Sequence, residues 1–458
     1  MTIAPVTRSA VNPDKHNERL LVLADDLTGA LDTGVQFAKK SISTGVFPCA
    51  EEINAVNQNT GSPDFSVTVI NTDSRHISPE ASRKIIKTAV NADNNFTYFY
   101  KKTDSCLRGN IGAELEALME AADSRFLAFV PAYPDLKRYT RNGYQYLEEK
   151  PIHESSMAND PFNPITESFV PAIIGKQSKI PVRIVPAGGK ITASKNREIL
   201  VFDAQETKDL KSIAAALLKK KLLHVSAGCA GFAQALTETL PLEKKPDTEK
   251  QKITELPLLI VSGSLHPVSI NQVKTAMRAD IPAIGANCDA VSYGAVYCGA
   301  VYRETSGMSD PAPEDAEKII SFCAKELGSK KICILGTKAA LGEKTMSAED
   351  TAPGKGQADV SASAQIAQSI GSLVKKIISK TGPLNLAIFG GDTLLGIAKA
   401  LEYKCLAPLL EIRPGVVLAQ IYGQEKGLLI TKAGAFGEAN LIKIIADYLN
   451  SRYLFASA

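Results

Sequence analysis

The sequence predicts an α/β fold, with two α/β domains built on largely parallel sheets. Three observations lead to this prediction. The chain has 458 residues, more than one hydrophobic core usually organises. Short apolar, β-rich runs alternate with helical patterns, as in parallel sheets. A charged segment with two prolines, residues 241–256, separates two such series and is typical of an interdomain linker.

The first series predicts a domain over residues 19–240, after a disordered N-terminus at residues 1–18. Its first strand, within residues 19–26, leads into a helix whose apolar residues repeat at helical spacing. The later strands are expected within residues 66–76, 96–105, 125–134, 198–206 and 221–228, and helices within 78–90, 112–122 and 232–240.

The second series predicts another domain over residues 257–458. A strand within residues 257–264 precedes a helix within 266–279. Further strands and helices are expected within residues 331–337, 384–402 and 426–449. The small, polar segment 342–363 is predicted to be a surface loop.

Composition excludes several classes of protein. Hydrophobic residues make up 45% and charged residues 22%, as in a soluble globular protein. The net charge is +3 and the isoelectric point about 8.2, so charge gives no reason to expect a nucleic-acid partner. The eight cysteines include no C-x-x-C pair, which favours buried thiols in a reducing compartment. With no signal-peptide core and no membrane-length apolar run, we expect a cytoplasmic protein without a membrane partner.

Polar residues at the ends of the first four strands define one candidate site. They are, in strand order, Asp25 and Asp26; Asp73 and Arg75; Lys101, Lys102 and Asp104; and Tyr133. Because ligands bind beyond the carboxyl ends of parallel strands, these side chains should lie on one edge of the sheet. For Asp25 and Asp26 three roles stay open: helix N-cap, Mg²⁺ ligand, or general base in phosphoryl transfer. We expect one acid to be structural and the other chemical.

Cations are concentrated in the segment 101–110, directly after a β-rich run. An arginine side chain binds carboxylate or phosphate through two parallel hydrogen bonds, so Arg75 and Arg108 are candidate anchors for an acidic substrate. The structural alternative is an ion pair between Arg108 and one of the acids. His153 and His266 are more typical of hydrogen-bonded surface residues than of ligands.

Three glycine-bearing turns in the second series, residues 261–264, 389–393 and 431–437, define another candidate site. The chain has no G-x-x-x-x-G-K-[ST], no G-x-G-x-x-G after a strand and no H-E-x-x-H. Backbone N–H groups at such turns, with a helix N-terminus behind them, bind phosphate well. Each turn alone is also explained as a tight turn, with Asp392 as an N-cap. Three turns in one domain favour phosphate binding.

Seven blocks of the sequence resemble the signature blocks of the four-carbon acid sugar kinases. They lie at residues 24–30, 71–76, 101–110 and 131–164, and at residues 261–272, 389–393 and 431–437. The resemblance implies an ATP-dependent kinase that phosphorylates the terminal (4-) hydroxyl of a four-carbon sugar acid such as D-threonate, D-erythronate or 3-oxo-tetronate. It also implies that the first domain binds the sugar acid and the second binds ATP, with an active-site cleft between them. A homo-oligomer is left open.

The resemblance carries over to individual residues. Those in substrate-domain motifs are Asp25, Asp26, Arg75, Lys102, Asp104, Ser105, Arg108 and Gly109. Those in nucleotide motifs are Ser264, Gly390, Gly391, Asp392, Thr393, Gly434 and Gly437. The chain departs from common family residues at Cys106, His266, Ser269, Ala433 and Ala435, which bears on substrate preference and nucleotide affinity more than on reaction type.

The predicted mechanism places Arg75, Arg108 and Lys102 on the substrate carboxylate and makes Asp25 or Asp26 the base. Mg²⁺ accompanies ATP, and closure about the 241–256 linker excludes water. Lys432 either neutralises developing charge or is a surface lysine.

Two rival functions remain. A sugar-acid-binding regulator would bind without turnover, although no DNA-binding motif is evident. A metal-dependent dehydratase or aldolase, with Asp25, Asp26 and Asp104 on the metal and Lys102 as base, would leave the glycine turns unexplained.

Overall fold

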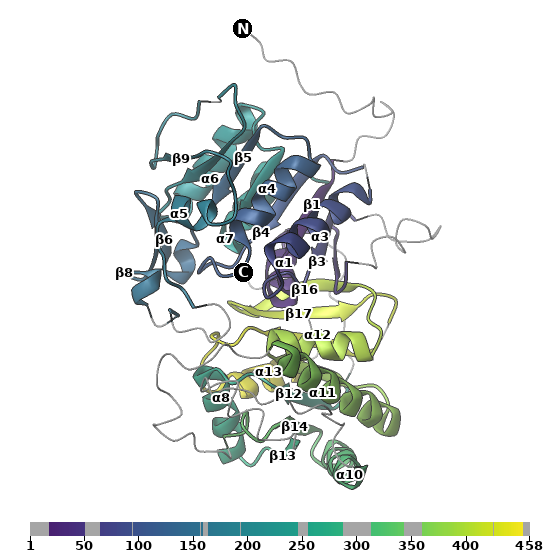
Figure 1. Ribbon diagram of the computed structural model, residues 1–458. Helices are drawn as coiled ribbons and strands as arrows, with labels where there is room; N and C mark the ends of the chain where they lie inside the picture. Colours follow the sequence, from purple (N-terminus) through teal and green to yellow (C-terminus); the bar gives the residue numbers. More distant parts are fainter. Residues whose placement is uncertain are drawn as a thin grey trace.

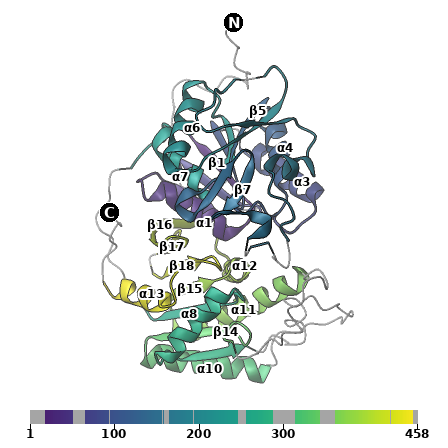
Figure 2. The same ribbon diagram turned by 90° about the vertical axis from the view of Figure 1, so that its left-hand side faces the viewer.

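The computed structural model describes residues 18–50, 65–93, 95–155, 157–158, 164–192, 194–245, 255–286, 313–342, 360–424 and 426–451. We call residues 18–245 the N-terminal half and residues 255–451 the C-terminal half. Figures 1 and 2 show the two halves stacked one above the other. Residues 1–17 of the expected disordered N-terminus and residues 246–254 of the expected linker lie outside the described residues.

Eight parallel strands form the sheet of the N-terminal half, in the order β2-β3-β1-β4-β11-β5-β10-β9. Helices α1, α6 and α7 cover one face, and α3, α4 and α5 cover the other. A separate antiparallel sheet, β6-β7-β8, lies at one edge. The elements are β1 (Leu20–Ala24), α1 (Leu27–Ala38), β2 (Thr44–Phe47), β3 (Val67–Asn71), α3 (Pro79–Asn91), β4 (Tyr98–Lys102), α4 (Ile111–Ala121), β5 (Phe126–Val130), β6 (Arg138–Arg141), β7 (Tyr144–Leu147), β8 (Lys150–Pro151), α5 (Val170–Gly175), β9 (Val182–Val185), β10 (Glu198–Phe202), α6 (Thr207–Lys219), β11 (Val225–Gly228) and α7 (Ala230–Thr239).

The C-terminal half continues with the parallel strands β13-β14-β12-β15-β18, followed by the antiparallel strands β17 and β16. Helices α10, α11 and α12 lie on one face, and α8 and α13 on the other. The elements are β12 (Leu258–Ser262), α8 (Pro267–Arg278), β13 (Ala283–Ala286), α10 (Pro313–Ser329), β14 (Ile332–Thr337), α11 (Val360–Thr381), β15 (Asn385–Phe389), α12 (Gly391–Ala400), β16 (Leu406–Arg413), β17 (Val416–Ile421), β18 (Leu428–Lys432) and α13 (Leu441–Asn450).

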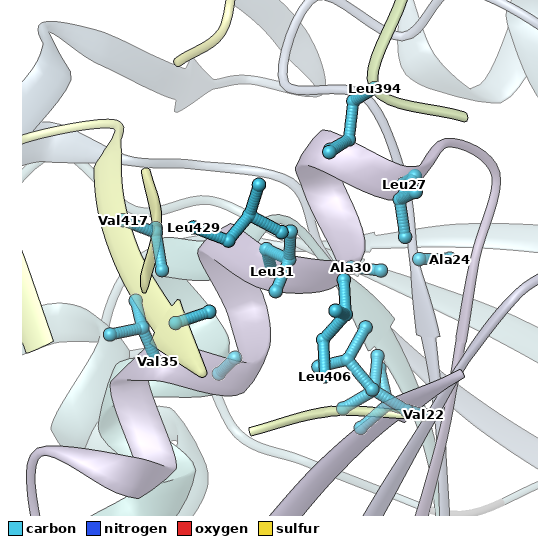
Figure 3. Close-up of a cluster of buried hydrophobic side chains, with 14 of the residues drawn as sticks. Val22, Ala24, Leu27, Ala30, Leu31, Val35, Leu394, Leu406, Val417 and Leu429 are labelled. Carbon is cyan, nitrogen blue, oxygen red and sulfur yellow. The ribbon is translucent and has the colours of Figure 1, made fainter. Parts of the chain in front are cut away.

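One antiparallel pairing, Leu406 in β16 with Val46 in β2, joins both sets of strands into a single sheet. Helix α1 packs over this junction, against β16, β17, β18 and α12. Figure 3 shows the apolar seam that results, with Leu31 and Val35 of α1 beside Val417 and Leu429. Burial of these side chains holds the halves together without the linker.

The prediction of an α/β fold with largely parallel sheets is confirmed, but the sheets of the two halves are continuous. Closure about the 241–256 linker stays a prediction, and the β2–β16 pairing and the apolar seam are further connections between the halves. The predicted loop 342–363 is wrong over its last four residues, which open α11. Residues 343–359 of that loop lie outside the described residues. No helix among the described residues is long and apolar enough to cross a membrane.

Candidate functional site

Two adjoining hollows lie between the halves, beyond the carboxyl ends of the central strands. The first has a volume of about 280 Å³, and the C-terminal half contributes residues of all three glycine turns to its lining. The second, of about 170 Å³, is lined mainly by strand ends of the N-terminal half. The residues that line both hollows are Asp26, Thr28, Arg75, Arg108, Ala433 and Gly434. The cleft predicted from the sequence is therefore present, and its two parts meet at Asp26.

Asp26 is the N-cap of α1. Its carboxylate accepts hydrogen bonds from the Gly29 backbone N–H at 2.7 Å and the Thr28 hydroxyl at 3.1 Å. Arg75 Nη1 lies 2.8 Å from Asp26 Oδ2, and the Asp26 side chain is 25% exposed. A carboxylate at this position is favoured by the helix dipole and still reaches both hollows.

Asp25, by contrast, is 2% exposed. Arg75 Nε donates to its Oδ2 at 2.7 Å, whereas its Oδ1 has no hydrogen-bond partner among the described residues. Burial acts to raise the pKa of Asp25, but the positive charges of Arg75, Lys101 and Lys102 outweigh it, and the pKa lies below its ordinary value. Asp25 is thus a buried counter-ion that stays ionised.

A buried ionic network holds these strand ends in place. Lys101 Nζ lies 3.1 Å from Glu114 Oε2, and both side chains are at most 1% exposed. Ser74 donates its hydroxyl to the other Glu114 oxygen, and its backbone N–H donates to the Asp25 carbonyl at 3.2 Å. Because Ser74 precedes Arg75, the network fixes the position of that arginine relative to β1.

Arg108 forms the ion pair that the sequence left as its structural alternative. Its Nε and Nη2 donate to the two Asp104 oxygens at 2.7 and 2.9 Å. Burial opposes ionisation of Asp104, but the Arg108 guanidinium holds the pKa of that carboxyl well below its usual range. Lys102 and Ser105 line the second hollow, whereas Gly109 lines neither and packs its backbone, at φ +92°, against Arg75.

Glycines allow the three turns of the C-terminal half to converge. A Cβ at Gly263 would clash with the Thr393 hydroxyl, and a Cβ at Gly434 would lie 3.2 Å from Ser264 Oγ. Gly390, at φ +120°, is the N-cap of α12 and provides no side-chain cap. The first N–H groups of a helix have no intrahelical acceptor, so α12 presents those of residues 391–393 to the first hollow. This arrangement fits phosphate groups.

Lys432 is buried, so its interpretation as a surface lysine is wrong. Its Nζ donates to Ser269 Oγ at 2.6 Å and to the Gly434 carbonyl at 2.9 Å, and it lies 5.0 Å from the centre of the Phe389 ring. Burial lowers the pKa of Lys432 to about 7. Lys432 supports the third turn from behind.

Gly437 lines neither hollow. A Cβ there would lie 3.1 Å from Gln272 Nε2, which donates to three carbonyls of the same turn. Gly437 therefore belongs to the structure of the turn. His266 lines the second hollow, where its Nδ1 accepts from the Val268 N–H at 3.2 Å, while His153 contacts Ser168 away from both hollows.

Several residues of the second hollow were not predicted from the sequence, among them Asp32, Arg138 and Val417. Asp32 lies two turns into α1, and burial raises its pKa to about 6. Arg138 begins β6, in a hairpin whose Asn-Gly turn is a strong sequence signal. Val417 comes from the C-terminal half, and no local pattern predicts that it faces this hollow, whereas Phe436 belongs to the predicted turn 431–437.

Metal ligands do not gather into a protein cage in the part of the chain that the structure describes, where no three His, Cys, Asp or Glu side chains form a cluster. Two carboxylates, Asp73 and Asp392, face the first hollow from opposite halves. Burial raises the pKa of Asp73, as do the neighbouring Asp392 and Asp26, and the opposing charge of Lys399 does not cancel this rise.

Comparison with known families gives two matches that together span most of the chain. Residues 20–236 match the model of a sugar-binding N-terminal domain, and residues 259–442 match that of a nucleotide-binding C-terminal domain. The first match contains the strand-end acids and the second contains the glycine turns.

Similar proteins cover nearly the whole chain. A D-threonate kinase of Salmonella typhimurium is 28% identical, over 95% of this chain and 99% of its own length. A D-erythronate kinase of Heliobacterium modesticaldum is 26% identical, over 94% of this chain and 97% of its own length. The crystal structure of a Haemophilus influenzae protein has the same fold, with a TM-score of 0.65 at 20% identity over 94% of this chain and 100% of that one.

Proposed function

The chain belongs to the four-carbon acid sugar kinase family, and we propose that it transfers the γ-phosphoryl group of ATP to the terminal (4-) hydroxyl of a four-carbon sugar acid. D-Threonate, D-erythronate and 3-oxo-tetronate are the candidate acceptors. One observation carries the proposal: a hollow with helix N–H groups for phosphate adjoins a small hollow of charged groups, and Asp26 lies where they meet. We expect a cytoplasmic enzyme, because free thiols persist in a reducing compartment and the proposed reaction needs ATP. A homo-oligomer stays a prediction.

The triphosphate would lie in the first hollow. The N-terminus of α12 and the turn at Ser264 supply donors and a favourable dipole, and Gly434 completes the wall. Mg²⁺ usually binds through one or two carboxylates together with substrate phosphates, which Asp73 and Asp392 fit. When bound, the ion would offset phosphate charge.

The sugar acid would lie in the second hollow, with its terminal hydroxyl at the junction. Asp26 accepts the hydroxyl proton as the oxygen attacks the γ-phosphorus, the bond to the bridging β–γ oxygen breaks, and ADP leaves. Arg75 and Arg108 line both hollows and so face the transferring group, where they would stabilise its charge.

A coupled ADP-release assay tests the proposal. Wild-type protein with Mg-ATP is assayed against D-threonate, D-erythronate, L-threonate and 3-oxo-tetronate, and ATP binding is measured separately. Turnover with one or more acids is expected. ATP binding without turnover on any acid would refute the substrate assignment and favour a binding protein. Absence of ATP binding would refute the kinase assignment itself.

A further inference from the structure

The arginines that line the second hollow differ in whether a carboxylate of the protein neutralises them. Arg75 is paired with Asp25 and Asp26, and Arg108 is paired through two hydrogen bonds with Asp104. These two guanidinium groups, which the sequence predicted to bind the substrate carboxylate, already have carboxylate partners within the protein. A substrate carboxylate would have to compete with those internal partners at either arginine.

Arg138 is different. It is 9% exposed and lines the second hollow, where its Nη1 donates to the Leu136 carbonyl at 3.0 Å. Its Nε is buried without a hydrogen-bond partner, and among the described residues no Asp or Glu lies within 4.0 Å of its guanidinium. Its positive charge acts instead on the thiols of Cys106 and Cys229, and its side chain also hydrogen-bonds to Cys106. A buried cation without an anion is unfavourable, so an anionic ligand here would restore the balance.

The geometry of the reaction also decides which end of the hollow binds the carboxylate. The hydroxyl that receives the phosphoryl group must lie beside Asp26, where the hollows meet. In a four-carbon acid the carboxylate is at the other end of the chain, away from the first hollow. Arg138 lines only the second hollow, whereas Arg75 and Arg108 line both.

Lys102 also lines only the second hollow, but it lies at the junction end. A Cβ built on Gly29 would clash with the Asp26 carboxylate and lie 2.7 Å from Lys102 Nζ, so both groups flank Gly29. Lys102 is therefore placed near the reacting hydroxyl, and Arg138 is the remaining cation for the far end.

We propose that Arg138 is the residue that binds the substrate carboxylate and so selects an acid over a neutral sugar. This assignment rests on the proposed function. An arginine fork matches a carboxylate through two parallel hydrogen bonds, which fixes both the charge and the orientation of the substrate. Held at that end, a four-carbon chain directs its terminal hydroxyl toward Asp26.

The test compares Arg138→Gln and Arg138→Lys with Arg141→Gln, a control on the same strand whose exposed guanidinium stacks 4.7 Å from the Tyr146 ring centre. Each protein is assayed with the acid that wild type prefers and with its primary amide. For Arg138→Gln we expect KM for the acid to rise about 100-fold, the value for lost charged hydrogen bonds. We expect KM for ATP to stay unchanged and the preference for acid over amide to collapse. Arg138→Lys should lose less, and Arg141→Gln nothing.

Other results would overturn the assignment. A folded Arg138→Gln protein with wild-type KM for the acid would do so, as would a loss in kcat alone or an unchanged acid-to-amide ratio. If Arg138→Gln does not fold, Arg138→Lys decides the matter, since it keeps the buried charge but not the fork. Absence of turnover by wild type would instead refute the proposed function, and this assignment with it.

Discussion

Replacing Asp26 by Asn separates a chemical role for this residue from a structural one. Asn caps a helix about as well as Asp, and its single amide oxygen accepts from the Gly29 N–H, whereas the oxygen that accepts from the Thr28 hydroxyl is replaced by an NH₂ group. The negative charge that pairs with Arg75 is lost, but Arg75 keeps its bond to Asp25. The substitution therefore removes the proposed base while the local structure stays in place.

We expect Asp26→Asn to change the free energy of unfolding little and kcat strongly. The Asp26–Arg75 pair is only partly buried, so its loss should cost no more than about 1 kcal/mol in the free energy of unfolding. Loss of a general base typically lowers kcat by between about a hundredfold and ten-thousandfold. Asp25→Asn should behave in the opposite way, because it removes one partner of a buried pair and should cost about 3 to 5 kcal/mol of stability.

Both variants are to be measured by ADP release under saturating Mg-ATP, by thermal unfolding and by ATP binding. The reasoning predicts a folded, ATP-binding and inactive Asp26→Asn protein, beside a destabilised Asp25→Asn protein. It would be refuted if Asp26→Asn kept kcat within about tenfold of wild type. A stable, inactive Asp25→Asn protein beside an active Asp26→Asn protein would make Asp25 the base and Asp26 the structural acid.

Three further predictions follow from the same contacts. Gly29→Ala should lower kcat, because the new Cβ displaces Asp26 and Lys102, and it should also lower the melting temperature, because the displaced Asp26 is the N-cap of α1 and a lost cap costs about 1 kcal/mol. Lys101→Met should lower the free energy of unfolding by about 3 to 5 kcal/mol in a denaturant titration, because it leaves a buried carboxylate unpaired. Burial raises the pKa of Asp32 from 3.8 to about 6, so the folded state keeps a proton that the unfolded chain releases, and stability falls as pH rises through that window. Asp32→Asn should therefore melt higher than wild type above pH 6, and by less near pH 4.

The first two of these have matched control variants. Gly328→Ala lies in α10, where a Cβ meets nothing within 4 Å, and should not change kcat. Lys87→Met breaks an exposed pair with Glu120 and should cost less than about 1 kcal/mol. Wild-type kcat in Gly29→Ala would contradict the first prediction. Equal losses of unfolding free energy in Lys101→Met and Lys87→Met would contradict the second. A gain in the melting temperature of Asp32→Asn that does not depend on pH would contradict the third.

Much of the fold followed from the sequence because parallel strands are local signals. A buried apolar run ending in polar residues and followed by a helix, as at residues 20–38, fixes both the element and the edge on which its polar residues lie. That is why the sequence predicts the strand-end acids and the glycine turns as candidate site residues. Their pairing within one cleft was inferred from the resemblance, not from any periodicity.

The antiparallel elements were missed, although the chain signals them. Asn142 and Gly143 both have positive φ, as a two-residue hairpin turn requires, and they separate β6 from β7. Pro414 and Gly415, of which Gly415 has a positive φ, form the two-residue turn between β16 and β17. Omitting the first hairpin hid Arg138, and omitting the second hid the continuity of the sheet. No local pattern specifies that β16 pairs with β2, because this contact joins residues 360 positions apart.

The two adjacent acids divide their roles because of where β1 ends. Successive side chains of an extended segment point to opposite faces, and the backbone at Asp26 is extended, at φ −144° and ψ 157°. Asp25 consequently belongs to the buried layer in which Lys101 contacts Glu114 of α4, while Asp26 lies on the side of α1 and caps it. Arg75 reaches both carboxylates and ties the two layers together. A single acid could either balance the buried cations or face the cleft, and a cleft that needs a fixed, ionised carboxylate beside a phosphate site requires both.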